Sequence, residues 1–259
     1  MKSKKLKKLQ GAVKASRKKL NTFVQKEKIA IKQTVGQHYG DNGADEPFPV
    51  NMMDIATATL LQQLAAKEPQ ILLLTRDPSL KSTAKETELA INEMLLRMDF
   101  GEELRAFVMS ALYSMGIMKV GIEPVFMAEI DGEELAETQV FAEHIPFEDW
   151  VHDCTAQTWD PEQVQFCGHT YRKPLDWVKE NEAFDKEARE KVQKREHSTF
   201  DAKEEEGASG ISHGESALDE EFVDYVYLWD IWIPSEGKLV TYAHAGESNL
   251  METTLEGRQ

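Results

Sequence analysis

The sequence predicts an α+β fold in which helices pack on a small, mostly antiparallel sheet. Up to residue 116, apolar residues recur at the three- and four-residue spacing of helices. From residue 117 onward the pattern changes towards the alternation that is typical of strands. With 259 residues, of which 41% are hydrophobic, the chain is long enough to bury a sizeable core. Runs of helices followed by runs of strands therefore place the chain in the α+β class.

Several classes of protein are disfavoured by composition and by missing motifs. No apolar run approaches the roughly 18 residues of a membrane span, and the N-terminus lacks the apolar core of a signal peptide. Two cysteines provide no disulfide framework. The motifs GxGxxG, HExxH, GxSxG and the Walker lysine loop are absent, and no catalytic constellation can be assigned from spacing. We therefore expect a soluble intracellular protein.

Residues 1–35 predict a basic amphipathic helical arm. Apolar residues fall on one helical stripe that Ser16 interrupts: Leu6, Leu9, Val13, Leu20 and Phe23. Residues 1–32 hold twelve Lys and Arg against one acid, Glu27, although the whole chain carries a net charge of −16. A basic arm could meet nucleic acid, an anionic lipid surface or the acidic face of a neighbouring copy, and a solvated lysine-rich helix is the alternative. The candidate interaction residues are Lys4, Lys5, Lys7, Lys8, Lys14, Arg17, Lys18 and Lys19.

Residues 48–196 are expected to form a helical and β core, which a polar loop at 36–49 separates from the arm. Three helices are predicted in its first half. The first starts near Asn51, ends before Pro69 and carries Met52, Ile55, Ala56, Thr59 and Leu60 on one face. The second resumes at Ser82 with Ile91, Met94, Leu95 and Met98 on one face. The third carries Leu104, Phe107, Val108, Ala111, Leu112 and Met115, and Gly116 is placed as its C-terminal cap. Apolar stripes at this spacing are expected to belong to the core, and an adaptable Met-rich binding surface is the alternative. Between the first two helices, QILLLTRDP (residues 70–78) predicts a short buried strand.

The second half of the chain is expected to be mainly extended. Residues 117–130 and 137–146 predict a hairpin around Asp131 and Gly132, with Gly121 and Pro124 marking an edge or a bulge. VQFCGHTYR (residues 164–172) predicts another strand, which is followed by a helix that Pro174 opens. Residues 197–220 predict a flexible acidic loop rich in Ser and Gly, and residues 221–259 predict an aromatic β-hairpin.

A metal site is one interpretation of the stretch HDCTAQTWDPEQVQFCGH. His152, Cys154, Cys167 and His169 are the Cys2His2 ligand set of structural zinc. However, each pair is separated by one residue instead of two to four, and two residue rises along a strand strain chelation of one ion by both members. The alternative is that both cysteines are small buried fillers and both histidines are polar residues at strand ends. On this balance we expect no metal.

The order of segments gives another interpretation of the same region. IPFEDWVHDCTAQTWDPEQVQFCGHTYRKPLDWVKE follows a helix, a glycine and a strand pair, and this order resembles the portal, or head-tail connector, proteins of tailed bacteriophages. The matching positions are Ile145, Pro146, Trp150 and Asp153, then Asp160 to Val164, and then Pro174, Leu175 and Trp177. The helix from Asn51 towards Pro78 and the aromatic hairpin resemble further parts of the family. The resemblance runs from about residue 51 to residue 243.

The resemblance implies a mechanical function without covalent chemistry, so we expect no enzymatic activity, no cofactor and no membrane partner. Portal subunits form a dodecameric ring at one capsid vertex, through which the terminase motor packages double-stranded DNA and from which the DNA is ejected into the tail. The implied partners are further copies of the chain, the major capsid protein, terminase and a tail or adaptor protein, and the implied location is the virion, with the host cytoplasm during assembly. The family's stem, clip and crown are not in this sequence, so we expect the N-terminal part, chiefly the wing.

Two rival hypotheses remain. In the first, the chain is a non-portal nucleic-acid-binding or interaction module that uses the lysine arm directly, with the acidic body as its scaffold. In the second, it is a zinc-containing enzyme or structural module built on His152, Cys154, Cys167 and His169.

Overall fold

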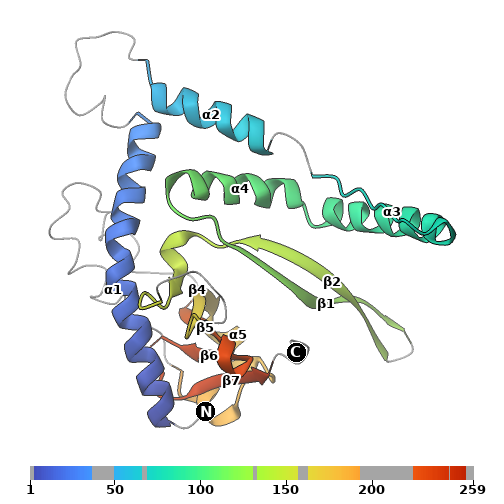
Figure 1. Ribbon diagram of the computed structural model, residues 1–259. Coiled ribbons are helices and arrows are strands. Elements are labelled where there is room, and N and C mark those ends of the chain that lie inside the picture. Colours follow the sequence, from blue (N-terminus) through green and yellow to red (C-terminus); the bar gives the residue numbers. More distant parts are fainter. Residues whose placement is uncertain are drawn as a thin grey trace. The chain divides into compact units, whose positions relative to one another are not determined.

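The computed structural model describes residues 3–36, 50–65, 69–130, 133–156, 163–192, 224–244 and 246–254. Side chains of residues 123–137 also lie outside the description. The described part confirms the α+β class, with six α-helices and antiparallel sheets of two and five strands (Figure 1). The chain forms two compact units, one made of Met1–Leu20 with Asp149–Gln259 and the other of Asn21–Glu148. We call them the sheet unit and the helical unit.

The sheet unit is built on the five-stranded antiparallel sheet, whose spatial order follows the chain. Its strands are β3 (Trp150–His152), β4 (Cys167–Pro174), β5 (Tyr225–Ile233), β6 (Lys238–Ala243) and β7 (Asn249–Thr254). Strands β5 and β6 confirm the predicted aromatic hairpin. Its turn is a 3-10 helix followed by Gly237, whose positive φ of 57° favours glycine. Strand β7 was not predicted.

Two short helices cover one face of this sheet. Alternation along β5 places Val226 and Leu228 on that face, where they form a core cluster with residues of α5 (Leu175–Glu180), α6 (Lys186–Glu190) and their surroundings. The other members are Val178, Phe184, Ala188, Val192, Ala243 and Leu250. Pro174 precedes α5 as predicted, but the single expected helix is two helices, because residues 181–185 turn between them.

The first half of α1 (Ser3–Thr34) lies against the other face of the sheet. It contacts Trp229, the residue that follows Leu228 on β5, and alternation along the strand places Trp229 on the face opposite α5 and α6. Arg17 lies 5.2 Å from the centre of the Trp229 ring. The predicted stripe is confirmed at its buried positions, which are Leu6, Val13 and Leu20. Two details of the prediction are wrong: Phe23 is exposed, and Ser16 is itself buried on the stripe.

A half-buried carboxylate, that of Asp230, joins three strands of the sheet. Asp230 Oδ1 accepts hydrogen bonds from the Thr241 hydroxyl at 2.6 Å and from the Tyr171 hydroxyl at 3.3 Å. Burial, followed by the Asp230 charge, raises the pKa of Tyr171 far above its ordinary value, so the phenol keeps the proton that it donates. Thr241 is fully buried, so its hydrogen bond satisfies a hydroxyl that water cannot reach.

In the helical unit, α4 (Phe100–Tyr113) contacts α2 (Met52–Ala65), α3 (Lys81–Arg97) and the two-stranded sheet. That sheet is the predicted hairpin, with β1 (Met118–Ile130) paired to β2 (Glu133–His144).

Polar contacts fix α4 at several points. The Tyr113 hydroxyl donates to Thr34 Oγ1 at 2.9 Å, Arg105 Nε donates to the Ala65 carbonyl at 3.1 Å, and the His144 N–H donates to Glu103 Oε2 at 2.6 Å. These contacts tie α4 to the end of α1, to the end of α2 and to the end of β2.

Three predictions for the helical unit are wrong. Residues 70–78 form neither a strand nor a buried segment, since Ile71, Leu72 and Leu74 are exposed. The face predicted to be buried on α2 is exposed, and Thr57 and Ala65 are buried instead. The predicted faces of α3 and α4 contain no fully buried residue. For Gly121 and Pro124 an edge or a bulge was expected: the register shift lies between Phe126 and Ala128 instead, but both residues do lie on an edge strand, since β1 pairs only with β2 in the described structure.

Gly116 does not cap α4, because the helix ends at Tyr113 with Ser114 as its C-cap. A Cβ at Gly116 would lie 2.8 Å from the Phe107 ring, so this glycine permits the chain to pass close to α4. Of the predicted loops, residues 37–49 and 197–220 lie outside the described residues. No described helix is long and apolar enough to cross a membrane.

We predict that Gly168→Ala destabilises the protein. A Cβ on β4 at this position would lie 2.0 Å from the Asp230 carbonyl oxygen, so the β4–β5 pair must separate. Overpacking of this kind costs about 1–3 kcal/mol or more. The measurement is the free energy of unfolding from urea titration.

Gly11→Ala is the matched control. A Cβ at Gly11 meets nothing within 4 Å, and alanine in a helix interior gains about 0.5–1 kcal/mol over glycine. Equal effects from the two substitutions would contradict the role given to the β4–β5 contact.

Candidate interaction surface

The eight predicted basic residues of α1 separate into two groups. Lys5 forms an ion pair with Glu236, and Arg17 lies over the Trp229 ring, so both contact the sheet unit. The other six side chains are exposed. At 100° per residue, Lys4, Lys8 and Lys18 lie opposite the stripe of Leu6, Val13 and Leu20, and Lys7, Lys14 and Lys19 lie on its flanks. We call these six the lysine ridge: Lys4, Lys7, Lys8, Lys14, Lys18 and Lys19.

The lysine ridge concentrates positive charge on one side of the helix. The first turn of α1 holds no acid, and Glu27 is the first acidic residue of the helix. From Lys4 to Lys19 the ridge extends about 22 Å, at 1.5 Å per residue. Lysines near a helix N-terminus also face the positive end of the helix dipole. The ridge is therefore a surface that an anionic partner would stabilise.

The four residues of the metal hypothesis occupy different environments. His152 lies directly opposite Cys167 on the β3–β4 pair, and its Nδ1 accepts a hydrogen bond from Trp150 Nε1 at 3.2 Å. Cys154 instead faces α1, where its thiol donates to the Ser16 carbonyl at 3.7 Å. The His169 ring lies against Tyr171, with 5.6 Å between the ring centres.

Burial keeps both thiols protonated. It raises the pKa of Cys167 to about 11, and it also raises the pKa of the Cys154 thiol. Burial likewise lowers the pKa of His152. Within the described ranges, no group of three or more His, Cys, Asp or Glu side chains is placed to hold a metal ion.

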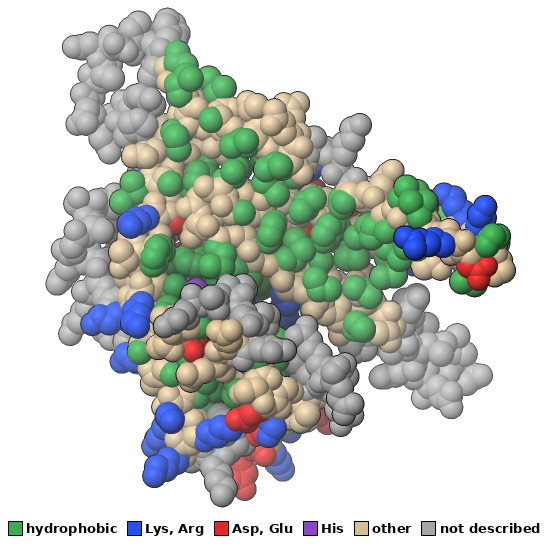
Figure 2. All heavy atoms as spheres, viewed as in Figure 1, with side chains coloured by type: hydrophobic (Ala, Val, Ile, Leu, Met, Phe, Trp, Pro, Cys, Tyr) green, Lys and Arg blue, Asp and Glu red, His purple; other side chains and the backbone are tan. Residues whose placement is uncertain are grey.

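The helical unit leaves its apolar side chains uncovered. Among the described residues, 20 of the 22 exposed large hydrophobic side chains belong to it, whereas 20 of the 25 buried hydrophobic residues belong to the sheet unit. Hydrophobic side chains gather on the face that Figure 2 shows. We call the main exposed set the apolar surface: Met52, Ile55, Leu60 and Leu64 on α2, Ile71, Leu72 and Leu74 after it, Leu89, Met94 and Leu96 on α3, and Val120 and Ile122 on β1.

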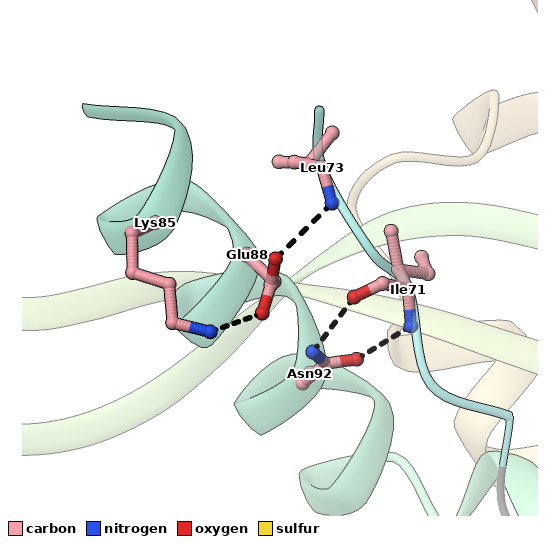
Figure 3. Close-up of polar contacts among 5 residues, drawn as sticks. All are labelled: Ile71, Leu73, Lys85, Glu88 and Asn92. Carbon is pink, nitrogen blue, oxygen red and sulfur yellow. Dashed lines mark hydrogen bonds and ion pairs between the residues drawn. The ribbon is translucent and has the colours of Figure 1, made fainter. Parts of the chain in front are cut away.

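Two polar residues of α3 that the sequence analysis missed hold the extended segment 70–75 in place (Figure 3). The Asn92 side chain accepts from the Ile71 N–H at 2.9 Å and donates to the Ile71 carbonyl at 3.0 Å. Glu88 Oε2 accepts from the Leu73 N–H at 3.2 Å, while its other oxygen pairs with Lys85. The hydrogen bonds from Lys85 and Leu73 lower the pKa of Glu88. In the sequence, the only signal was an acid followed by Asn four residues later, and this pattern is the same as that of an ordinary solvated helix face.

No protein-family model matches this chain, and no curated protein matches it either.

We predict that the two cysteines differ in their rate of alkylation. Cys154 is half-buried and Cys167 is buried with a pKa of about 11, so at pH 8 a maleimide should modify Cys154 much faster than Cys167. Mass spectrometry of the labelled peptides measures both rates. Equal rates, or rates that fall together when zinc is added, would contradict the packing role of the thiols.

Proposed function

We propose that this chain is a portal, or head-tail connector, subunit that assembles into a dodecameric ring at a capsid vertex. The observation that carries the proposal is the apolar surface of the helical unit, which supplements the order of segments from Ile145 to Trp177. Exposed apolar surface on this scale marks a protein interface. The proposed role is the passage of double-stranded DNA, with terminase, the major capsid protein and a tail or adaptor protein as partners.

A ring explains why one unit is well packed and the other is not. A ring of identical subunits uses a heterologous interface, in which two different surfaces of the chain meet. Burying one exposed leucine or isoleucine side chain contributes about 1.5–3 kcal/mol. The apolar surface holds enough such side chains to hold neighbouring copies together, whereas the sheet unit has its own core.

The charge distribution is compatible with transport of DNA. The net charge of −16 disfavours tight binding of a duplex by the body of the protein, because such binding depends on neutralised phosphates. The lysine ridge would then meet the acidic face of the next copy, which would favour assembly in the correct orientation.

We predict that the full-length protein forms rings with a central channel and about twelve subunits. Negative-stain electron microscopy and native mass spectrometry measure shape and stoichiometry. A monomer or a small dimer at all salt concentrations would contradict the proposal. Leu64→Ser should raise the concentration for half-assembly about tenfold or more, because it removes an exposed leucine from the apolar surface.

Gln63→Ser is the matched control for that variant, since it places the same residue at a neighbouring exposed position of α2. Its assembly should match that of the unmodified protein. Urea titration of the unassembled chain should show that neither substitution changes the free energy of unfolding by more than about 0.5 kcal/mol.

The lysine ridge favours a second candidate function, which is binding of a duplex through its phosphates. Lysine without interleaved aromatic residues suits phosphate contacts more than single-stranded bases. If the ridge binds duplex, the triple variant K14Q/K18Q/K19Q should reduce the slope of log affinity against log salt by up to about 2.7, at about 0.9 per lost phosphate contact. Fluorescence anisotropy with a short labelled duplex measures this slope.

The triple variant K179Q/K186Q/K191Q is the control, because it removes the same charge from exposed lysines of the sheet unit. If both variants weaken duplex binding equally, the ridge is not a binding site. If duplex binding is weak in all forms but ring assembly loses its salt dependence only in the ridge variant, the ridge contacts another copy.

A further inference from the structure

The extended segment 70–75 has hydrogen-bonding partners along one edge. The backbone groups of Ile71 and Leu73 are directed to the side chains of Asn92 and Glu88 on α3 (Figure 3). The paired contacts of the Asn92 amide reproduce the donor and acceptor pattern of a neighbouring strand. Side chains of α3 thus hold this segment in a strand-like conformation.

The opposite edge of the segment is open. In an extended chain, successive residues direct their N–H and C=O groups to opposite edges, so Leu72 and Leu74 direct theirs away from α3. Within the described residues, no hydrogen bond involves the backbone of either leucine. Their side chains are 69% and 86% exposed. The segment QILLLT also lacks the charge or proline with which proteins commonly protect an exposed edge.

A complementary edge exists in the same chain. In the described structure, β1 pairs only with β2, so one edge of β1 has no neighbouring strand. Val120 and Ile122 alternate along β1 and are 67% and 69% exposed. A two-stranded sheet is marginally stable by itself, and a third strand would complete it.

We propose that segment 70–75 of one copy adds as a strand to the open edge of β1 in a neighbouring copy. The occupant is a second copy because the donor edge and the acceptor edge are two different surfaces of one sequence, both apolar and both with the spacing of a strand. Such a contact is heterologous and repeats from subunit to subunit. The inference rests on the proposed ring and names the segments that join its subunits.

The pairing would bring Leu72 and Leu74 beside Val120 and Ile122. Cross-strand pairs of apolar and β-branched side chains stabilise a sheet, and the backbone hydrogen bonds would satisfy both open edges. Asn92 and Glu88 act as positioning residues, because they hold the segment extended before the neighbour arrives.

The test mixes two full-length variants in a background of Cys154→Ser and Cys167→Ala. One carries Leu74→Cys, and the other carries Ile122→Cys together with an affinity tag. Oxidation of the assembled mixture should give a disulfide-linked pair at least tenfold more abundant than in a control mixture with Glu182→Cys, an exposed residue of the sheet unit, in place of Ile122→Cys. Since each copy holds one cysteine, a link can form only between copies.

A second pair of variants makes the test independent of the cysteine background. Leu74→Pro removes the outward N–H but leaves the bonds of Ile71 and Leu73 to α3, so it should raise the half-assembly concentration about tenfold. Leu74→Val keeps both the N–H and an apolar β-branched side chain, and it should assemble like the unmodified protein.

The outcomes separate the two proposals. If Leu74→Pro forms rings normally and the mixture of the Leu74→Cys and Ile122→Cys variants gives no link, the strand addition is overturned and the proposed ring stands. A disulfide that forms within one chain of a Leu74→Cys/Ile122→Cys double variant would also overturn the strand addition, because the segment would then reach the β1 strand of its own copy. Failure of the unmodified protein to form rings would overturn both.

Discussion

The antiparallel pairing of β4 with β5 determines the rest of the sheet unit. The eight residues from Cys167 to Pro174 face those from Trp232 to Tyr225, and Gly168 lets the two backbones approach. This register decides which β5 side chains point to each face of the sheet. Leu228 consequently meets α5 and α6, while Trp229 meets α1, and a shift by one residue would exchange these faces. The docking of three helices thus depends on one strand pair.

The two units satisfy their backbone groups in different ways. In the sheet unit, β5 has a paired strand on each side, and the side chains between the sheet and its two short helices form a core. In the helical unit, the segment at 70–75 obtains partners from Asn92 and Glu88 along one edge, and Leu72 and Leu74 stay exposed. A side chain can replace a strand in the hydrogen-bond pattern, but it adds no second layer of apolar contacts.

Periodicity predicted the elements better than it predicted their burial. The stripe of α1, both hairpins and the turn at Gly237 carry local signals, namely helical spacing, alternation and glycine at a positive φ. The prediction of a buried strand at QILLLT was wrong because an apolar run has the same sequence pattern whether or not a neighbouring layer covers it. Likewise, six of the eight basic residues form the ridge. The sequence could not show that the other two, Lys5 and Arg17, contact Glu236 and Trp229, because these partners are more than 200 residues distant along the chain.

The apolar surface and the net charge of −16 act in opposite directions on free copies of the chain. An open strand edge with exposed apolar side chains promotes irregular association. Repulsion between like-charged molecules slows each encounter until ions screen the charges. The charge therefore serves as a kinetic barrier to precipitation of free copies. Ionic strength sets the height of this barrier, so the salt concentration around newly made copies decides how fast they associate and how ordered the product is.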